Sequence, residues 1–369
     1  MNKLSTDDVC QAFIAPKSTL AFTLKQWQQL VLILRHQQLL ACYSSTFKQT
    51  GIFEHIPKQT QRHFLNADVL AQNHKKQVLF EAAELKRELA DKPQYLIFLK
   101  GAGYSLSGAP VGDTRIYNDI DILADKKSID AIEKRLCLIG WLSEELTEHD
   151  EKYYRKWAHE IPPLRHGKRG TIVDVHHNIV PIISGRHVDA DKFAKNTVTT
   201  EDGFQILSFA AMTLHSLIHL FFNEEVKKGY RDLIDLHTLM TTNNNEAFWL
   251  DLISLAKETD FGLELFLACR YTQKILKTEV PGYVHKEISQ FCPWNIAFVD
   301  FIYEKTLKPN HPLCKPKFFV LAEFAVLIRG HFQKMPLHIL IYHLLCKSGV
   351  SLIKSIFGKH VFTKELAQP

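Results

Sequence analysis

The sequence contains no uninterrupted apolar run of about eighteen residues, so we expect no helix that crosses a membrane. Nor does it begin with the apolar segment of a secretory signal, because Asp7 and Asp8 place acidic charge near Met1. Its seven cysteines include no C-x-x-C pair, a pattern that predicts reduced thiols rather than a disulfide framework. We therefore expect a cytoplasmic protein.

The chain also carries little net charge. The 45 basic and 40 acidic residues leave a formal net charge of only +5. This balance is compatible with anionic small substrates, but it gives no strong signal for nucleic-acid binding, which favours a concentrated basic patch. The 369 residues, 46% of them hydrophobic, are enough for two or three domains with a sizeable core.

The order of local patterns divides the chain into three regions. Helical periodicity fills residues 1–92, and strand and helix signals alternate over residues 93–203. Helical periodicity returns over residues 204–369. We expect an N-terminal helical region, a core that contains a sheet, and a C-terminal helical domain.

The central region carries two carboxylates two residues apart. Asp119 and Asp121 lie in an apolar stretch, residues 115–123, that is typical of a strand. Side chains at i and i+2 of a strand share one face, about 6.6 Å apart. Two carboxylates on one rigid face can hold Mg²⁺, and this arrangement suits nucleotidyl transfer, in which two metal ions align a displacement at phosphorus.

A third carboxylate follows on a predicted hairpin. Residues 164–175 alternate as two strands around the turn Gly167-Lys168-Arg169-Gly170, which carries Asp174 onto a strand able to lie beside the first pair. Three clustered carboxylates repel one another, so a metal ion is needed to neutralise them. Between the strands, the glycine-rich residues 102–114 predict a loop that bends over a ligand, and residues 128–139 predict a helix.

Several short runs together resemble a known family. They are Leu99-Lys100-Gly101-Ala102, Arg115, Asp119-Ile120-Asp121-Ile122-Leu123 and Val173-Asp174-Val175-His176-His177. They resemble the hallmark LKGA…R…DIDLL…vDlHw of an uncharacterised bacterial nucleotidyltransferase family of the polymerase-beta-like superfamily. The resemblance covers roughly residues 20 to 280. Two positions differ from the expected pattern. Gly101-Ala102 stands where many nucleotidyltransferases have Gly-Ser, and His177 stands where the family more often has an aromatic residue.

The resemblance implies an α+β fold, in which a small mixed-sheet core lies between the two helical regions. It also implies metal-dependent transfer of a nucleoside monophosphate from an NTP to a hydroxyl or phosphate acceptor, with Mg²⁺ or Mn²⁺ as cofactor. Asp119, Asp121 and Asp174 are then the catalytic and metal-binding residues. The first two would hold both ions, and Asp174 would complete the metal nearer the acceptor.

Six residues are candidates for binding the nucleotide and its phosphates. They are Lys100, Gly101, Ala102, Ser105, Arg115 and His176. Backbone N–H groups at Gly101-Ala102, with Lys100 or Ser105, would replace the hydroxyl of a Gly-Ser pair. Arg115 offers a planar fork for phosphate oxygens, and His176 shares the face of Asp174.

Two other functions stay open at this point. The Gly101-Ala102 pair is also compatible with a degenerate NTP-binding or protein-interaction module that performs no turnover. His215 and His219, four residues apart on a predicted helix, could form a metal-dependent hydrolase site with Asp235. A buried histidine–aspartate contact, or the wall of a substrate pocket, explains the same three residues.

The sequence leaves the acceptor open between a small molecule, a glycan precursor and a protein. Near the C-terminus, residues 335–357 combine apolar positions with Lys347 and Lys354. Such an amphipathic stretch is compatible with a peripheral contact to a membrane, and equally with a helix that packs on the core.

Overall fold

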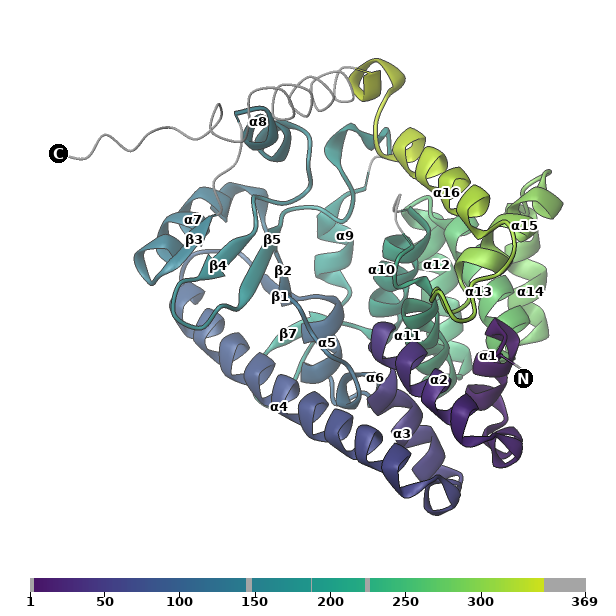
Figure 1. Ribbon diagram of the computed structural model, residues 1–369. Helices are drawn as coiled ribbons and strands as arrows, with labels where there is room; N and C mark the ends of the chain where they lie inside the picture. Colours follow the sequence, from purple (N-terminus) through teal and green to yellow (C-terminus); the bar gives the residue numbers. More distant parts are fainter. Residues whose placement is uncertain (1–2, 144–147, 187, 223–225, 342–369) are drawn as a thin grey trace, which may run out of the picture.

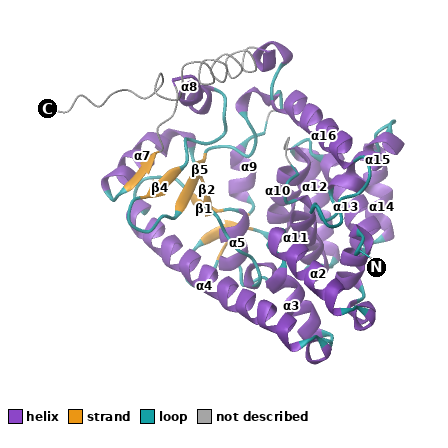
Figure 2. Cartoon of the chain, viewed as in Figure 1, coloured by secondary structure: helices purple, strands orange, loops and turns teal. Residues whose placement is uncertain are grey.

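The computed structural model describes residues 3–143, 148–186, 188–222 and 226–341. Its centre is a seven-stranded mixed sheet in the order β3-β4-β5-β2-β1-β7-β6. Figure 2 shows strands in orange with helices in purple around them. The strands are β1 (Leu96–Phe98), β2 (Ile120–Ala124), β3 (Trp141–Ser143), β4 (Leu164–His166), β5 (Ile172–His176), β6 (Thr197–Thr199) and β7 (Gln205–Leu207). Helices flank this sheet, so the predicted α+β class is confirmed.

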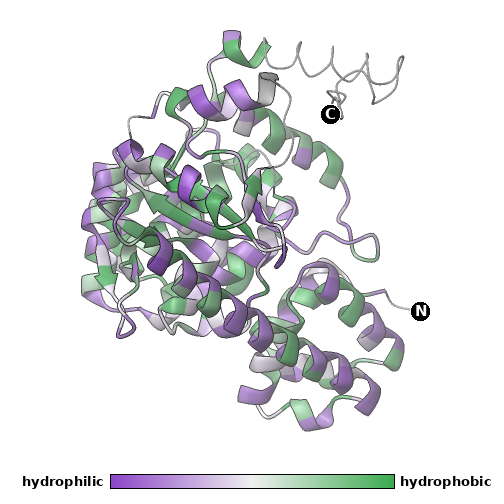
Figure 3. Ribbon diagram, turned by 90° about the vertical axis from the view of Figure 1, so that its left-hand side faces the viewer, coloured by the Kyte–Doolittle hydropathy of each residue, from purple (hydrophilic) through white to green (hydrophobic). Residues whose placement is uncertain are grey.

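The three middle strands hold the candidate carboxylates. Strand β2 pairs in parallel with β5 and antiparallel with β1, and the register sets Asp121 opposite Asp174. On the other face of β2, Ile120 and Ile122 are at most 2% exposed. These central strands are hydrophobic over most of their length (Figure 3). Because one face is fully buried, a one-residue slip of register is strongly disfavoured.

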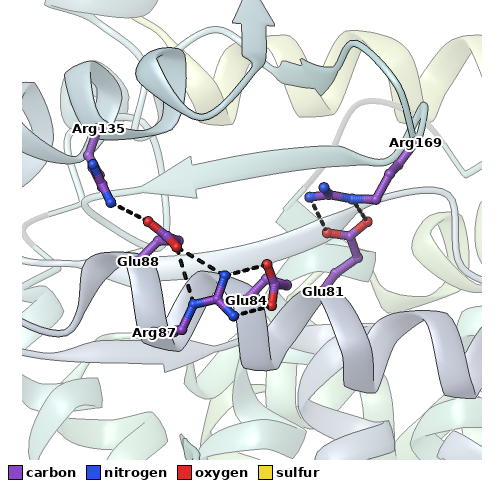
Figure 4. A network of polar contacts seen from close by, with 6 residues as sticks. All are labelled: Glu81, Glu84, Arg87, Glu88, Arg135 and Arg169. Carbon is purple, nitrogen blue, oxygen red and sulfur yellow. Dashed lines mark hydrogen bonds and ion pairs between the residues drawn. The ribbon is translucent and has the colours of Figure 1, made fainter.

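A long helix, α4 (Lys58–Leu89), runs along the sheet and fixes its hairpin (Figure 1). Glu81 of α4 is fully buried, and its two carboxylate oxygens accept hydrogen bonds of 2.6 and 2.8 Å from Arg169 in the β4–β5 turn. Farther along α4, Glu88 pairs with Arg135 of α7 (Ile129–Leu138) (Figure 4). The helix therefore ties together two elements that border the carboxylate strands.

The two helical regions pack against each other as well as against the core. The N-terminal helices are α1 (Thr6–Ile14), α2 (Leu24–His36) and α3 (Leu40–Gln49). The 3-10 turn η1 (Pro16–Ala21) lies between α1 and α2, and η2 (Phe53–His55) leads from α3 to α4. The buried hydroxyls of Tyr43 on α3 and Tyr230 on α11 (Gly229–Thr242) lie 2.8 Å apart. Figure 1 shows these N-terminal helices beside the C-terminal ones.

The C-terminal region is helical, as predicted. Its first helices are α10 (Phe209–Phe222), α11, α12 (Glu246–Glu258) and α13 (Gly262–Leu276). They are followed by α14 (Gly282–Ile288), η5 (Ser289–Phe291), α15 (Ile296–Thr306) and α16 (Phe319–Lys334). None of the helices in the described part of the chain has the length and apolar character needed to span a bilayer. Of residues 335–357, those from 342 onward lie outside the described residues.

Two local expectations were wrong. Residues 102–114 do not form a loop: they belong mainly to α5 (Lys100–Leu106) and α6 (Pro110–Asp113). A Cβ on Gly103 would lie 2.8 Å from the Phe98 carbonyl oxygen, and one on Gly112 would lie 2.5 Å from that of Tyr104. The glycines thus allow close packing of helices rather than a flexible loop. In addition, the carboxylate strand begins at Ile120, so residues 115–119 form a loop before it.

The remaining elements connect the core. They are η3 (Lys126–Ser128), α8 (Glu148–Lys156), η4 (Ile182–Ser184) and α9 (Ala190–Lys195). Strand β7 pairs in parallel with β1, so the sheet extends to Leu207, slightly beyond the core of residues 93–203 expected from the sequence.

Candidate active site

Two carboxylates lie side by side at the middle of the sheet, and a third lies in the loop that leads into it. Asp121 and Asp174 are register partners on parallel strands, and Asp119 precedes β2 by one residue. Asp121 is only 6% exposed, Asp174 is half-buried, and Asp119 is exposed. The group therefore opens to solvent on the side of Asp119.

Two basic side chains hold the innermost carboxylate. The Nζ atom of Lys100 lies 3.4 Å from Oδ1 of Asp121, and Nε2 of His176 lies 2.9 Å from the same oxygen. Lys100 follows β1 directly and has a φ of 40°, a left-handed conformation that is unfavourable for a residue with a side chain. The backbone at Lys100 is therefore strained in the conformation that places its ammonium group near Asp121.

The environment separates the pKa values of the three acids. Burial acts to raise the pKa of Asp121, but Lys100 and His176 outweigh it and hold this pKa well below the ordinary value. Burial, reinforced by the negative charges of Asp121 and Glu160, raises the pKa of Asp174 to about 7. The pKa of Asp119 is also raised, by desolvation in the cleft and by Asp121. The cluster thus carries more negative charge than its basic neighbours neutralise.

The donor set fits a hard divalent cation in its chemistry. Its ligand atoms are carboxylate oxygens, which Mg²⁺ prefers. Oδ1 of Asp174 is buried and has no hydrogen-bond partner, and the Lys100 ammonium already supplies positive charge to Asp121. However, Asp119, Asp121 and Asp174 do not bring ligand atoms within 4.8 Å of one another among the described residues. Mutual repulsion, and the binding of Asp121 to Lys100 and His176, account for this separation.

His176 also contacts a carboxylate that the sequence motif did not include. Its Nδ1 atom lies 3.2 Å from Oε2 of Glu160. Glu160 forms an isolated antiparallel bridge with His176, and the amide of His177 donates to the carbonyl of His159 at 2.8 Å. Segment 159–161 thus lies along the end of β5. His159 has a buried Nδ1 without a partner, and burial lowers the pKa of its imidazole well below the ordinary value.

Three of the predicted phosphate ligands pack inside the protein. Gly101 lies against Tyr117, where a Cβ would be 2.5 Å from the ring, and Ala102 is 1% exposed. Ser105 is 3% exposed, and its hydroxyl lies 2.5 Å from that of Tyr117. The Ser105 side chain therefore fixes the loop before β2, while Lys100 is the member of this segment that reaches the carboxylates.

Arg115 faces acids of the C-terminal domain. Its guanidinium pairs with Asp235 and lies 3.4 Å from Asp232, both on α11. Burial acts to lower the pKa of Arg115, but these carboxylates outweigh it and raise the pKa. Arg231 binds Asp232 at 3.0 Å. In this conformation Arg115 joins the loop 114–119 to the helical domain, and its fork is not free for phosphate.

The second histidine cluster does not assemble with Asp235. That carboxylate is taken by Arg115, whereas His215 and His219 line a small cavity of about 30 Å³ with Lys100, His159 and His176. Burial lowers the pKa of His219 to about 3. Within the described residues, the His215/His219/Asp235 set brings no three ligand atoms close enough to hold a metal. The two histidines instead form a wall beside Lys100.

Two larger cavities lie elsewhere in the molecule, and one of them borders the carboxylates. This cavity, of about 150 Å³, is lined by Asp119, Tyr117 and residues 169–171 of the hairpin turn, among others. The second, of about 500 Å³, lies between α3, α6 and α11, with Arg115 and Asp235 in its wall. Its volume is in the range of small-molecule sites.

A family of uncharacterised nucleotidyltransferases matches residues 23–277 of this chain. The protein belongs to this family. The match spans α2 to the end of α13 and includes all of the candidate carboxylates and the whole sheet. Neither the curated proteins nor the solved structures gave a match. Family membership supports nucleotidyl transfer as the general class of chemistry.

The sequence motifs did not identify several residues that contact the candidate site. His159 and Glu160 lie in the segment Ala158-His159-Glu160-Ile161, which has no recognised spacing to the hairpin. Nothing in the sequence pairs Asp232 with Arg115. A buried imidazole or carboxylate is recognised as part of a site only when its neighbours are known.

Proposed function

We propose that this protein transfers a nucleoside monophosphate from an NTP to a hydroxyl or phosphate acceptor, with release of pyrophosphate. The observation that carries the proposal is the pairing of Asp121 with Asp174 on parallel strands, with Asp119 in the loop directly before Ile120 of β2. Burial, reinforced by the charges of Asp121, Glu160 and Asp119, raises the pKa of Asp174 to about 7, and a pure binding module has no need for acids placed at such a cost. Catalysis here consists mainly of positioning and charge stabilisation.

Asp119, Asp121 and Asp174 would hold Mg²⁺ or Mn²⁺, which supplies charge stabilisation and alignment at phosphorus. Lys100 neutralises part of the charge of Asp121 and, once a cation is bound there, becomes available to a phosphate oxygen. In this scheme the Asp174 carboxylate accepts the proton of the acceptor hydroxyl. His176 fixes the rotamer of Asp121 through its 2.9 Å contact.

We place the acceptor in the cavity of about 500 Å³ beside Arg115. The polar lining includes Ser45, Thr46, Thr238 and Thr241, which suits a hydroxylated small molecule or the end of a larger acceptor. The identity of the acceptor and the preferred base of the NTP stay outside this proposal. So does the peripheral membrane contact predicted for residues 335–357, although Leu337 and Ile341 in its described part are 55% and 50% exposed.

The test is calorimetry of NTP binding together with transfer of label from NTPs to components of a cell lysate, both in Mg²⁺ or Mn²⁺. We expect NTP binding to require the metal ion. Asp119→Asn should lose binding and transfer, whereas Asp174→Asn should keep most NTP affinity and lose transfer, because Asp174 acts mainly in the transition state. Asp251→Asn, an exposed acid on α12, is the matched control.

Two results would contradict the proposal. NTP binding of equal affinity in EDTA would exclude the metal-dependent mechanism. NTP binding without transfer to any acceptor, in wild type as in Asp174→Asn, would favour the module that binds NTP without turnover.

A further inference from the structure

A group of three ligand atoms lies beside the carboxylate cluster but is distinct from it. One ligand atom from each of His159, Glu160 and His176 lies within 4.8 Å of the other two. Within the described residues, no other set of three histidine, cysteine, aspartate or glutamate side chains meets this distance. These residues come from β5 and from the segment that bridges to its end, so their spacing is set by backbone pairing rather than by flexible side chains.

The chemistry of this set differs from that of the three aspartates. Two imidazole nitrogens and one carboxylate oxygen are typical of Zn²⁺ and related transition metals, whereas Mg²⁺ prefers oxygen ligands alone. We propose that His159, Glu160 and His176 form a second cation site, selective for Zn²⁺ or a similar transition metal. This inference goes beyond the proposed function and does not depend on it.

The surroundings of the site have room and polar groups for an additional ligand. The cavity of about 30 Å³ beside His159 and His176 can hold a water molecule. It is also lined by His215, which is 4% exposed and whose Nδ1 has no hydrogen-bond partner. Three protein ligands with a water in the fourth position are typical of an open zinc site.

His176 would connect the two cation sites. Its Nδ1 atom faces Glu160 and the proposed metal, while Nε2 lies 2.9 Å from Oδ1 of Asp121. When a metal binds Nδ1, the proton on that nitrogen leaves to solvent and Nε2–H donates to Asp121. A carboxylate that accepts from a metal-bound histidine in this way orients the ring. The same bond would orient Asp121, so the metal acts as a positioning element for the carboxylate cluster.

The competing explanation is a protonated His176 that bridges Glu160 and Asp121 with no metal. Both arrangements satisfy the two contacts of His176. They differ at His159, which has a buried Nδ1 without a partner in the bridged arrangement and supplies a ligand nitrogen in the metal-bound one. His159 therefore decides between the two arrangements.

The experiment uses the full chain, stripped with EDTA and exchanged into excess Mg²⁺. Titration with Co²⁺ should give visible absorption bands that saturate at one ion per chain, and Zn²⁺ should abolish them by displacement. His159→Ala and Glu160→Gln should each weaken Zn²⁺ binding at least about tenfold, because loss of an outer-shell partner alone costs about 10- to 100-fold. His177→Ala, the adjacent histidine outside the group, and Asp119→Asn should bind as the wild type does.

Circular dichroism and thermal melts of each variant establish that it is folded. Glu160→Gln is nearly isosteric and keeps the proposal testable if His159→Ala does not fold. Absence of Co²⁺ and Zn²⁺ binding in excess Mg²⁺ overturns the proposal, and so does binding that depends on Asp119 and Asp174 but not on His159. Because NTP binding in Mg²⁺ is measured separately, failure of this site leaves the proposed transferase function unaffected.

Discussion

Replacement of Asp174 by Asn should remove the pH dependence of folding stability that the ionisation of this residue causes. The pKa of Asp174 rises from an ordinary value of 3.8 to about 7, through burial and through the charges of Asp121 and Glu160. The folded protein therefore binds this proton more tightly than the unfolded chain does. Between about pH 4 and pH 7 the unfolded chain releases this proton while the folded protein still holds it, so the stability of the wild type falls as pH rises.

The magnitude follows from the size of the shift. About three pH units at 1.36 kcal/mol each give a contribution of up to about 4 kcal/mol, which the charged carboxylate costs at pH 8. Asp174→Asn removes this cost, so its free energy of unfolding relative to wild type should increase between pH 4 and pH 8 by up to that amount. A buried amide without a partner adds a penalty that does not depend on pH.

The assay is urea denaturation of wild type, Asp174→Asn and Asp251→Asn at several pH values, in EDTA and in Mg²⁺. Asp251→Asn controls for loss of an exposed negative charge. Mg²⁺ at about 100 times its Kd should stabilise the wild type by about 3 kcal/mol. Asp174→Asn should keep part of this stabilisation through Asp119 and Asp121, so the difference in stability at pH 8 becomes smaller in Mg²⁺. A difference between wild type and Asp174→Asn that is constant with pH would refute the reasoning.

Three further substitutions test how the site is held. Glu81→Gln removes the buried partner of Arg169, whose own side chain is 31% exposed, and should lower the free energy of unfolding by about 1–3 kcal/mol in urea denaturation; an unchanged midpoint would contradict this. Arg115→Ala should cost about 3–5 kcal/mol because Asp235 stays buried without its partner, and replacing that acid by Leu in the same chain should recover part of the loss. Gly101→Ala places a methyl group 2.5 Å from Tyr117 and should cost about 1–3 kcal/mol in thermal or urea unfolding; a variant as stable as wild type would show that the ring moves freely.

Local sequence was sufficient to predict the hairpin that carries Asp174, since its turn and its alternating strands are neighbours in sequence. The sequence also indicated a strand at Asp121. Asp119 precedes that strand, so the common face inferred from a spacing of two stays a prediction. The helices of the C-terminal region were also predictable, because α10 to α13 bury faces with a regular helical period.

The segment after β1 shows where local reasoning failed. Its glycines indicated a loop, yet Gly103 and Gly112 allow two short helices to pack against carbonyl oxygens at distances that a Cβ would forbid. A glycine can indicate either a flexible backbone or a close contact between two backbone segments, and which one applies depends on the atoms that face its Cα. Here those atoms belong to Phe98 and Tyr104. The sequence does not contain that information in any short pattern.

The sequence by itself determined which functional groups are present: three carboxylates, a lysine after a strand and a histidine two residues beyond Asp174. Tertiary structure decided which of these groups meet. The register of β2 with β5 sets Asp121 beside Asp174, and Arg115 is drawn to Asp235, 120 residues away, instead of remaining open to phosphate. A bridge at the end of β5 brings Glu160 to His176. Periodicity acts between neighbours in sequence, whereas charge pairing and burial depend on distances in space, which only the packed chain defines.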